Sequence, residues 1–345
     1  METLTLRNLS IKELGAFITD LGESKFRIKQ VSEWLWKKGV HEFSEMRNLP
    51  KSLIKKLEER SFIDKAIVTE ELISKDGSRK YAFTSMDGKL VEGVLIPSRK
   101  RVTACISVQA GCNVKCKFCA TGQLGLQRNL SKGEIFDQIY QLNQKSQDIF
   151  GSKLSNIVVM GMGEPFLNYS NVINALDMVS CDEGLGFSPQ RITISTVGII
   201  EGIDLLANHP RKYNLAISLH TAVESIRKQL IPIAVKNDLA DLRKSLENYH
   251  EKTGSRITLE YILFDKLNDD EKHMKALAQF CKAFPSKINL IEYNSVPELP
   301  FVASSEDDTS KFQKFLEDKN MLVYLRKSKG SDIFAACGQL ANKKM

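Results

Sequence analysis

Three cysteines that lie close together constrain this chain more than any other feature of its sequence. Cys112, Cys116 and Cys119 have the spacing C-x3-C-x2-C. This spacing gathers three thiolates around one small volume and supplies no fourth ligand. A cubane [4Fe–4S] cluster has four irons, and each iron takes a ligand. The triplet therefore predicts a cluster with one open iron, by the logic that makes an incompletely ligated metal reactive.

Other uses of three cysteines fit the sequence less well. Structural zinc normally takes four Cys or His ligands, but the chain has no second CxxC pair and none of its five histidines lies near the triplet. A disulfide framework is typical of short secreted chains, whereas this chain has 345 residues and an odd number of cysteines, seven. Three buried structural cysteines remain an alternative, although Asn113, Lys115 and Lys117 make a poor core segment.

The bulk composition favours a cytoplasmic protein without a membrane partner. Apolar residues make up 42% and charged residues 26% of the chain, as in soluble globular proteins. No apolar run approaches the roughly 18 residues that span a bilayer, and the N-terminus lacks an apolar signal core. The net charge of +7 permits a phosphate-rich partner without demanding one. Basic clusters occur at Arg99-Lys100-Arg101, at Arg326-Lys327-Ser328-Lys329, and at Lys115, Lys117 and Arg128 beside the cysteines.

Residues 1–97 are predicted to form a small α+β accessory domain. Leu14, Phe17, Ile18 and Leu21 recur at the spacing of one helix face, and the first 60 residues are predicted to be helical. Strand-like runs then follow at 67–69, 80–84 and 90–96, separated by Asp-Gly turns.

Residues 98–330 alternate between strand-like and helical patterns, which predicts a parallel sheet with right-handed crossovers. The predicted strands are 102–109, 156–161, 191–196, 214–219, 257–263 and 287–292, and the predicted helices are 131–149, 169–180, 199–207, 238–253 and 270–284. Six βα units are too few for an eight-fold barrel, so we expect an open (βα)6 partial barrel. A further strand at 321–327 precedes a C-terminal tail, 331–345.

Polar or glycine-rich groups follow five of the six predicted strands. Barrel enzymes place their chemistry at this edge, where the strands end. The cysteine loop follows the first strand, and the later strand ends carry Gly161-Met162-Gly163-Glu164-Pro165, Ser195-Thr196-Val197-Gly198, Ser218-Leu219-His220 and Tyr293-Asn294. We therefore expect these groups to share one rim with the cluster.

The cysteine spacing after the first strand of such a core resembles the radical S-adenosylmethionine (SAM) superfamily, and Gly161–Pro165 resembles its Gly-Glu loop. The flanks resemble the RlmN/Cfr branch of RNA methyltransferases over essentially the whole chain. These flanks are Gln109-Ala110-Gly111-Cys112, Cys119-Ala120-Thr121-Gly122, Arg128-Asn129-Leu130, Ser218-Leu219-His220 and Ala335-Ala336-Cys337-Gly338-Gln339-Leu340. Pro165, and Arg326-Lys327 before Gly330, favour the RlmN type. One departure is Phe334, where the family usually has Asp.

The resemblance implies methylation at C2 of adenosine in the peptidyl-transferase centre of 23S rRNA and at the adenosine 3′ of the anticodon in tRNA. It implies one [4Fe–4S] cluster on Cys112, Cys116 and Cys119, with SAM bound at the open iron. The implied SAM-binding residues are Gly163, Glu164, Ser195, Ser218, Leu219, His220 and Asn294.

The resemblance also assigns a methyl carrier and its partners. Cys337 takes a methyl group from one SAM, and a radical from a second SAM then activates that S-methyl group for addition to the base. Cys105 lies on the polar face of its predicted strand and releases the product by forming a transient disulfide with Cys337. Glu92 is the expected base for the C2 proton, because an apolar strand face favours its protonated form.

Two alternative functions stay open at this point. A Cfr-like enzyme would methylate C8 of adenosine, and a non-catalytic iron–sulfur protein would only bind RNA. We expect a monomer that draws electrons from an unidentified low-potential donor.

Overall fold

The computed structural model describes residues 4–99 and 101–341. Lys100 of the first basic cluster, residues 1–3 of the predicted accessory domain and residues 342–345 of the predicted tail lie outside the described residues. Within the described ranges, no helix is both long and apolar enough to cross a membrane.

One large sheet organises the described part of the chain, with strand order β14-β13-β12-β11-β10-β9-β6-β5-β4-β3. The strands from β6 to β14 pair in parallel, and β3 to β6 pair antiparallel. Their bounds are β3 Ala66–Ile73, β4 Arg79–Ser85, β5 Leu90–Ser98, β6 Arg101–Cys105, β9 Asn156–Val159, β10 Ile192–Thr196, β11 Asn214–Ser218, β12 Ile257–Leu263, β13 Ser286–Glu292 and β14 Val323–Arg326. The predicted open α/β barrel of parallel strands is confirmed, and β14 adds a further parallel strand at its edge.

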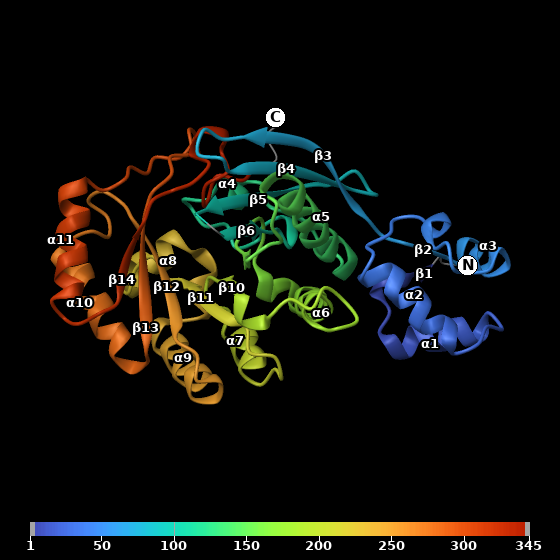
Figure 1. The fold of residues 1–345 in the computed structure, drawn as a ribbon. Helices are drawn as coiled ribbons and strands as arrows, with labels where there is room; N and C mark the ends of the chain where they lie inside the picture. Colours follow the sequence, from blue (N-terminus) through green and yellow to red (C-terminus); the bar gives the residue numbers. More distant parts are fainter. Residues whose placement is uncertain (1–3, 100, 342–345) are drawn as a thin grey trace.

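Helices follow the parallel strands and cover the outside of the sheet (Figure 1). Their bounds are α5 Lys132–Phe150, α6 Tyr169–Ser180, α7 Ile200–Ala207, α8 Glu224–Leu230, α9 Leu239–Thr253, α10 Glu271–Phe280 and α11 Glu306–Glu317. Long α5 starts at a capping box in which Ser131 and Glu134 bond each other's backbone, and such reciprocal bonds satisfy two N–H groups left unpaired at a helix start. Helices α8 and α11 have no counterpart among the predicted helices.

The first predicted strand is shorter than its sequence pattern suggested. Strand β6 ends at Cys105 rather than at residue 109. The reason is a side chain from α5: Gln138 accepts from the Ser107 N–H and donates to the Ser107 carbonyl, both at 2.9 Å. Because one amide satisfies both backbone groups, Ser107 needs no strand partner.

Three helices lie together at the N-terminal end, apart from the barrel (Figure 1). They are α1 Ile11–Asp20, α2 Phe26–Trp36 and α3 Lys51–Arg60, and the short strands β1 Leu4–Thr5 and β2 Ser61–Phe62 pair beside them. Buried Arg7 ties this group to the core, because its guanidinium lies 2.6 Å from the carboxylate of Asp137 on α5.

The strand pairing makes β3, β4 and β5 continuous with the barrel sheet. Val94 of β5 pairs with Cys105 of β6, and Cys105 in turn pairs with Val158 of β9. A residue on β5 therefore sits one strand away from the first barrel strand. This continuity brings Glu92 to the same end of the sheet as the cysteine loop.

Candidate active site

Short strands frame the cysteine loop. Strands β7 Gln109–Gly111 and β8 Leu126–Asn129 pair antiparallel on either side of it, and α4 Ala120–Gln123 begins directly after Cys119. Gly111 has φ +79°, and a Cβ there would lie 1.8 Å from the Gly125 carbonyl oxygen. That position therefore requires glycine.

The three cysteines of the loop are brought together. Cys112 and Cys116 are buried in one cluster with Phe118, and Cys119 packs against it. Burial raises the pKa of the Cys112 thiol to about 12 and that of Cys116 well above its usual value, and the neighbouring thiols push both further.

This arrangement fits a multi-iron cluster as the bound group. Neighbouring thiolates repel one another, and burial shields them from the water that would stabilise their charges. A positively charged group must therefore bind before all three thiols can ionise. Among residues 4–99 and 101–341, no three His, Cys, Asp or Glu side chains are arranged to hold one metal ion. A cubane binds each thiolate at a different iron, so its ligands need not converge on one point.

Glu164 lies beside this loop in the predicted Gly-Glu turn. Its carboxylate accepts from the N–H groups of Phe166 at 3.1 Å and Val197 at 2.9 Å. Burial raises its pKa to about 7. Gly163 has φ +99°, and a Cβ there would meet the Gln109 side chain at 2.5 Å. Gln109 also accepts from the Glu164 N–H at 2.8 Å, so it fixes the turn against β7.

The predicted residues at the ends of β10 and β11 also lie together. The hydroxyls of Ser195 and Ser218 are 3.3 Å apart, and Leu219 is fully buried. His220 has φ +57°, and its Nδ1 accepts from the Ile262 N–H at 3.1 Å. Burial and the charge of Arg227 lower the pKa of His220 to about 3, which keeps its ring neutral.

Arg227 on α8 is a candidate that the sequence reasoning missed. Its side chain is only 1% exposed, and its Nε and Nη1 have no hydrogen-bond partner among the described residues. Its charge acts on Cys116, and its Nη2 donates to the Val197 carbonyl. A buried cation with free donors is suited to an anion. In the sequence, Arg227 is marked as a site residue only by its position after the fourth predicted strand. The apolar spacing did not predict the helix that carries it.

The C-terminal tail, shown in red, returns to the cysteine loop (Figure 1). The Ala120 N–H donates to the Gly338 carbonyl at 2.8 Å, and the Thr121 hydroxyl donates to the Leu340 carbonyl at 2.6 Å. Asn294 donates to the Cys337 carbonyl at 3.3 Å. The tail is thus seated on the residues that directly follow Cys119.

Cys337 and Cys105 lie close enough for their charges to interact. Cys337 is exposed as a residue, but its thiol is surrounded by neighbouring protein atoms. This environment, with the negative charge of nearby Glu260, raises the pKa of its thiol to about 11. Burial raises the pKa of Cys105 to about 12. Glu260 was not predicted; it accepts from Asn289 at 2.8 Å inside the barrel.

Glu92 is buried, with 1% exposure, but it does not stand on a purely apolar face. Its Oε1 lies 3.0 Å from Nζ of Lys80 on β4, and its Oε2 accepts from the Ala341 N–H at 2.9 Å. The sequence reasoning missed Lys80. Lys80 and the Ala341 N–H therefore give the Glu92 carboxylate polar partners on a strand face that the sequence pattern suggested was apolar.

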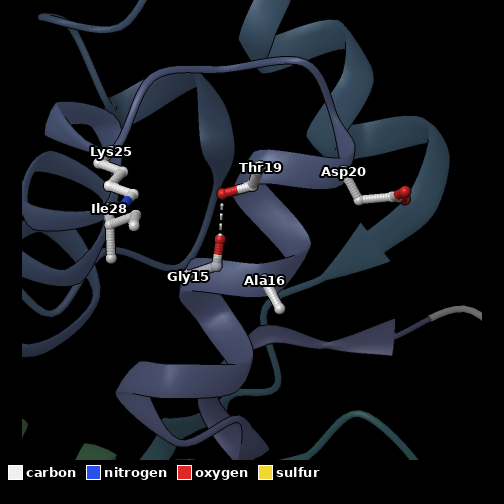
Figure 2. Close-up of a pocket in the computed structure, with 6 residues that line it drawn as sticks. All are labelled: Gly15, Ala16, Thr19, Asp20, Lys25 and Ile28. Carbon is white, nitrogen blue, oxygen red and sulfur yellow. Dashed lines mark hydrogen bonds between the residues drawn. The ribbon is translucent and has the colours of Figure 1, made fainter.

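A cavity of about 420 Å³ opens beside this ion pair. It lies between the N-terminal strands, the start of α4 and the tail, and it is lined by Leu72, Lys80, Glu92, Ala120, Val296, Pro297, Asp332, Ile333, Phe334, Gln339 and Ala341. A second hollow, between α1 and the start of α2, is lined by Gly15, Ala16, Thr19, Asp20, Lys25 and Ile28 (Figure 2). That second hollow contains none of the predicted site residues.

Comparisons with known proteins agree with this geometry. The radical SAM superfamily model matches residues 106–278, and the model of the ribosomal RNA large subunit methyltransferase N-terminal domain matches residues 4–63. A radical SAM methyltransferase from Sphaerobacter thermophilus superposes with a TM-score of 0.92 at 35% identity, covering 98% of this chain and 99% of that one. Fold and cysteine loop thus define a radical SAM protein.

Curated relatives narrow the class. Proteins named probable dual-specificity RNA methyltransferase RlmN, from Cytophaga hutchinsonii and Flavobacterium johnsoniae, are each 45% identical and cover 99% of this chain and 93% and 98% of the relatives. The RlmN of Syntrophus aciditrophicus is 38% identical over 99% of this chain and 98% of its own length. The chain belongs to the RlmN family.

Proposed function

We propose that this protein is a radical SAM RNA methyltransferase that places a methyl group on C2 of adenosine, in 23S rRNA and in tRNA. The observation that carries the proposal is that the C-terminal tail lies against the residues that follow Cys119. The Ala120 N–H and the Thr121 hydroxyl hold the Cys337 segment against the end of the cysteine loop, while Glu92 accepts from the same tail at the Ala341 N–H.

The reaction explains why such a site is needed. C2 of adenine lies between two ring nitrogens and offers no lone pair to an incoming CH3+ group. Direct displacement from SAM therefore fails at this carbon, whereas a carbon radical can add to it. A chain that performs this reaction needs a radical source and a methyl carrier within reach of one base.

Cys112, Cys116 and Cys119 are the residues that would hold the cluster. Gly163, Glu164, Ser195, Ser218, Leu219, His220 and Asn294 are proposed to hold SAM. When bound, cluster and SAM supply one-electron cleavage of the sulfonium and a carbon radical that abstracts hydrogen. Because His220 is neutral, it would contact an uncharged part of SAM. Glu164 would contact the methionyl ammonium group, whose positive charge would favour the ionised form of the Glu164 carboxylate.

Cys337 is the proposed methyl carrier, because a thiolate is a good nucleophile toward a sulfonium methyl group. Ala335, Ala336 and Gly338 flank it with little bulk. Glu92, which is paired with Lys80, would take the C2 proton. Attack of the Cys105 thiolate on the Cys337 sulfur would then form a disulfide and break the bond between that sulfur and the transferred carbon. The carbon would leave with the bonding electron pair and take up a proton, which completes the methyl group and releases the base.

The target adenosine is stacked in folded RNA and has to leave the stack to reach this site. The cavity beside Glu92 is where we place it. Its walls come from the N-terminal strands, the cysteine loop and the tail, so a base held there would face Glu92.

Nucleoside analysis tests the proposal. Purified, anaerobically reconstituted protein is incubated with SAM, a reductant and separate rRNA and tRNA fragments, and the RNA is digested and examined by mass spectrometry. We expect 2-methyladenosine. A product that elutes as 8-methyladenosine would identify C8 chemistry instead, and the absence of both methylated adenosine and 5′-deoxyadenosine would leave a non-catalytic RNA-binding protein.

A further inference from the structure

Phe334 is an exposed aromatic residue at the mouth of the cavity beside Glu92. Its side chain is 49% exposed and lines the cavity together with Glu92 and Lys80. It lies three residues before Cys337. A large apolar side chain that is about half open to water gains only part of the stabilisation that full burial would give, so its position calls for a further reason.

The backbone at Phe334 is also strained. Its φ is +51° and ψ +44°, in the left-handed region. Bulky residues seldom adopt this conformation, whereas Gly, Asn and Asp accept it more readily. Strain of this kind persists only where the surroundings hold it, and it often marks a functional position.

Named contacts hold this conformation. The Phe334 N–H donates to the Ser331 carbonyl at 3.2 Å, and Nζ of Lys80 donates to the Phe334 carbonyl at 3.4 Å. Asp332 accepts from the Ser74 hydroxyl at 2.6 Å, which fastens the same turn to the β3–β4 connection. The lysine that pairs with Glu92 thus also fixes the residue that presents the ring.

The composition of the cavity indicates what the ring would meet. Apolar walls come from Leu72, Ala120, Val296, Pro297 and Ile333, and the polar lining residues are Lys80, Glu92, Asp332 and Gln339. A planar, uncharged heteroaromatic group with polar edges matches such a lining, since its faces are apolar and its edges form hydrogen bonds. The volume of about 420 Å³ is within the range of small-molecule sites.

We propose that Phe334 is the stacking platform for the target base, which its ring holds against the cavity that contains Glu92. This inference rests on the proposed function, because it takes the base to be an RNA nucleobase. Stacking on an aromatic ring serves any base face, so Phe334 contributes affinity and position, while the polar groups at the cavity wall address the base edge.

The test compares Phe334→Tyr, Phe334→Leu, Phe334→Ala and Phe334→Asn in the full chain. Each is titrated with two short RNA hairpins that differ only at the target position, which carries adenosine in one and an abasic site in the other. Fluorescence anisotropy gives Kd, and thermal melting gives stability.

We expect Phe334→Tyr to bind the adenosine hairpin within about twofold of wild type. Phe334→Leu and Phe334→Ala should bind it about five- to 150-fold more weakly, the range that loss of base–aromatic stacking gives. On the abasic hairpin all variants should match wild type. Phe334→Asn should melt at a higher temperature than wild type, because Asn accepts a positive φ, and still bind the adenosine hairpin as weakly as Phe334→Ala.

Equal weakening on both hairpins, or wild-type affinity in Phe334→Leu and Phe334→Ala, would overturn the inference. Its failure is distinct from failure of the proposed function. In that second case the wild-type protein itself would form no methyladenosine.

Discussion

Lys80 and Glu92 form a buried ion pair between neighbouring strands, with 3.0 Å between Nζ and Oε1 and side-chain exposures of 6% and 1%. Removing one partner of such a pair leaves an uncompensated charge and costs about 3–5 kcal/mol. Lys80→Met should therefore lower the free energy of unfolding by an amount of that order. It should also release the Glu92 carboxylate from its position beside Nζ of Lys80, so methyl transfer should fall about tenfold or more.

Two companion variants separate the charge effect from misfolding. Lys80→Arg keeps the cation and should stay within a few-fold of wild type. The double variant Lys80→Met, Glu92→Gln removes both charges and should be more stable than Lys80→Met alone, yet inactive. Methyl transfer at the wild-type rate in the double variant would argue against the base role of Glu92.

The cluster assignment predicts a specific loss of iron. Cys116→Ala removes one of three thiolates, and the reconstituted protein should hold well below the four irons per chain of a [4Fe–4S] cluster and lose its charge-transfer absorption. Cys281→Ala is the matched control, since Cys281 is a buried cysteine at the C-terminal end of α10. Iron content that stayed at wild-type level in Cys116→Ala would remove this residue from the ligand set.

Substitutions at Cys337 and Cys105, the two other cysteines of the proposed site, should cause different defects. Cys337→Ala lacks the carrier and should form no methyladenosine. Cys105→Ala retains the carrier but cannot displace the product, so a covalent RNA–protein adduct should accumulate and survive denaturation. After nuclease digestion, mass spectrometry should find a nucleotide on the peptide that contains Cys337. In Cys181→Ala, altered at a cysteine outside the site, turnover should continue; adduct formation there as well would contradict the assignment.

Asp64 gives the junction between the N-terminal helices and α5 a pH dependence. Burial raises the pKa of its carboxyl from the usual 3.8 to about 6. The native state therefore binds the proton more tightly than the unfolded state between those pH values. Stability should fall as the pH rises from about 4 to 6, in total by on the order of 3 kcal/mol.

Asp64→Asn should remove this contribution. The amide keeps an oxygen that accepts from Ser131 and carries no charge. Urea unfolding followed at pH 4.5 and at pH 7.5 should show the variant gaining stability relative to wild type at the higher pH. A difference between the two proteins that does not change with pH would contradict the shifted pKa.

Much of the fold follows from local patterns in the sequence. Buried parallel strands show as short apolar runs, and long helices such as α5 show as apolar residues at helical spacing. Helix α11 buries only Phe312 and Leu316. Two apolar positions are too few to give a clear helical pattern in the sequence. Its better signal is Ser305, whose side chain caps the helix ahead of three acidic residues in the first turn.

The residues of the candidate site likewise fall into those that local sequence patterns reveal and those that only the folded structure reveals. The cysteine loop and the Gly-Glu turn are contiguous in sequence, so spacing reveals them. Lys80, Arg227 and Glu260 acquire their significance from strand pairing and helix packing between distant segments. The pair Lys80–Glu92 depends on the β4–β5 register, in which Ala82 lies opposite Glu92 and Lys80 opposite Val94, and no local pattern specifies that register.

The seat of the tail on the cysteine loop has a consequence for biosynthesis. Translation proceeds from the N-terminus, so the thiols of the loop and Cys105 emerge long before Cys337. On the proposed function, the growing chain would acquire its cluster ligands early, but it would lack a methyl acceptor until Cys337 is made and its segment folds back onto α4. A chain that stops before Cys337 would therefore have the cysteine loop without the proposed carrier.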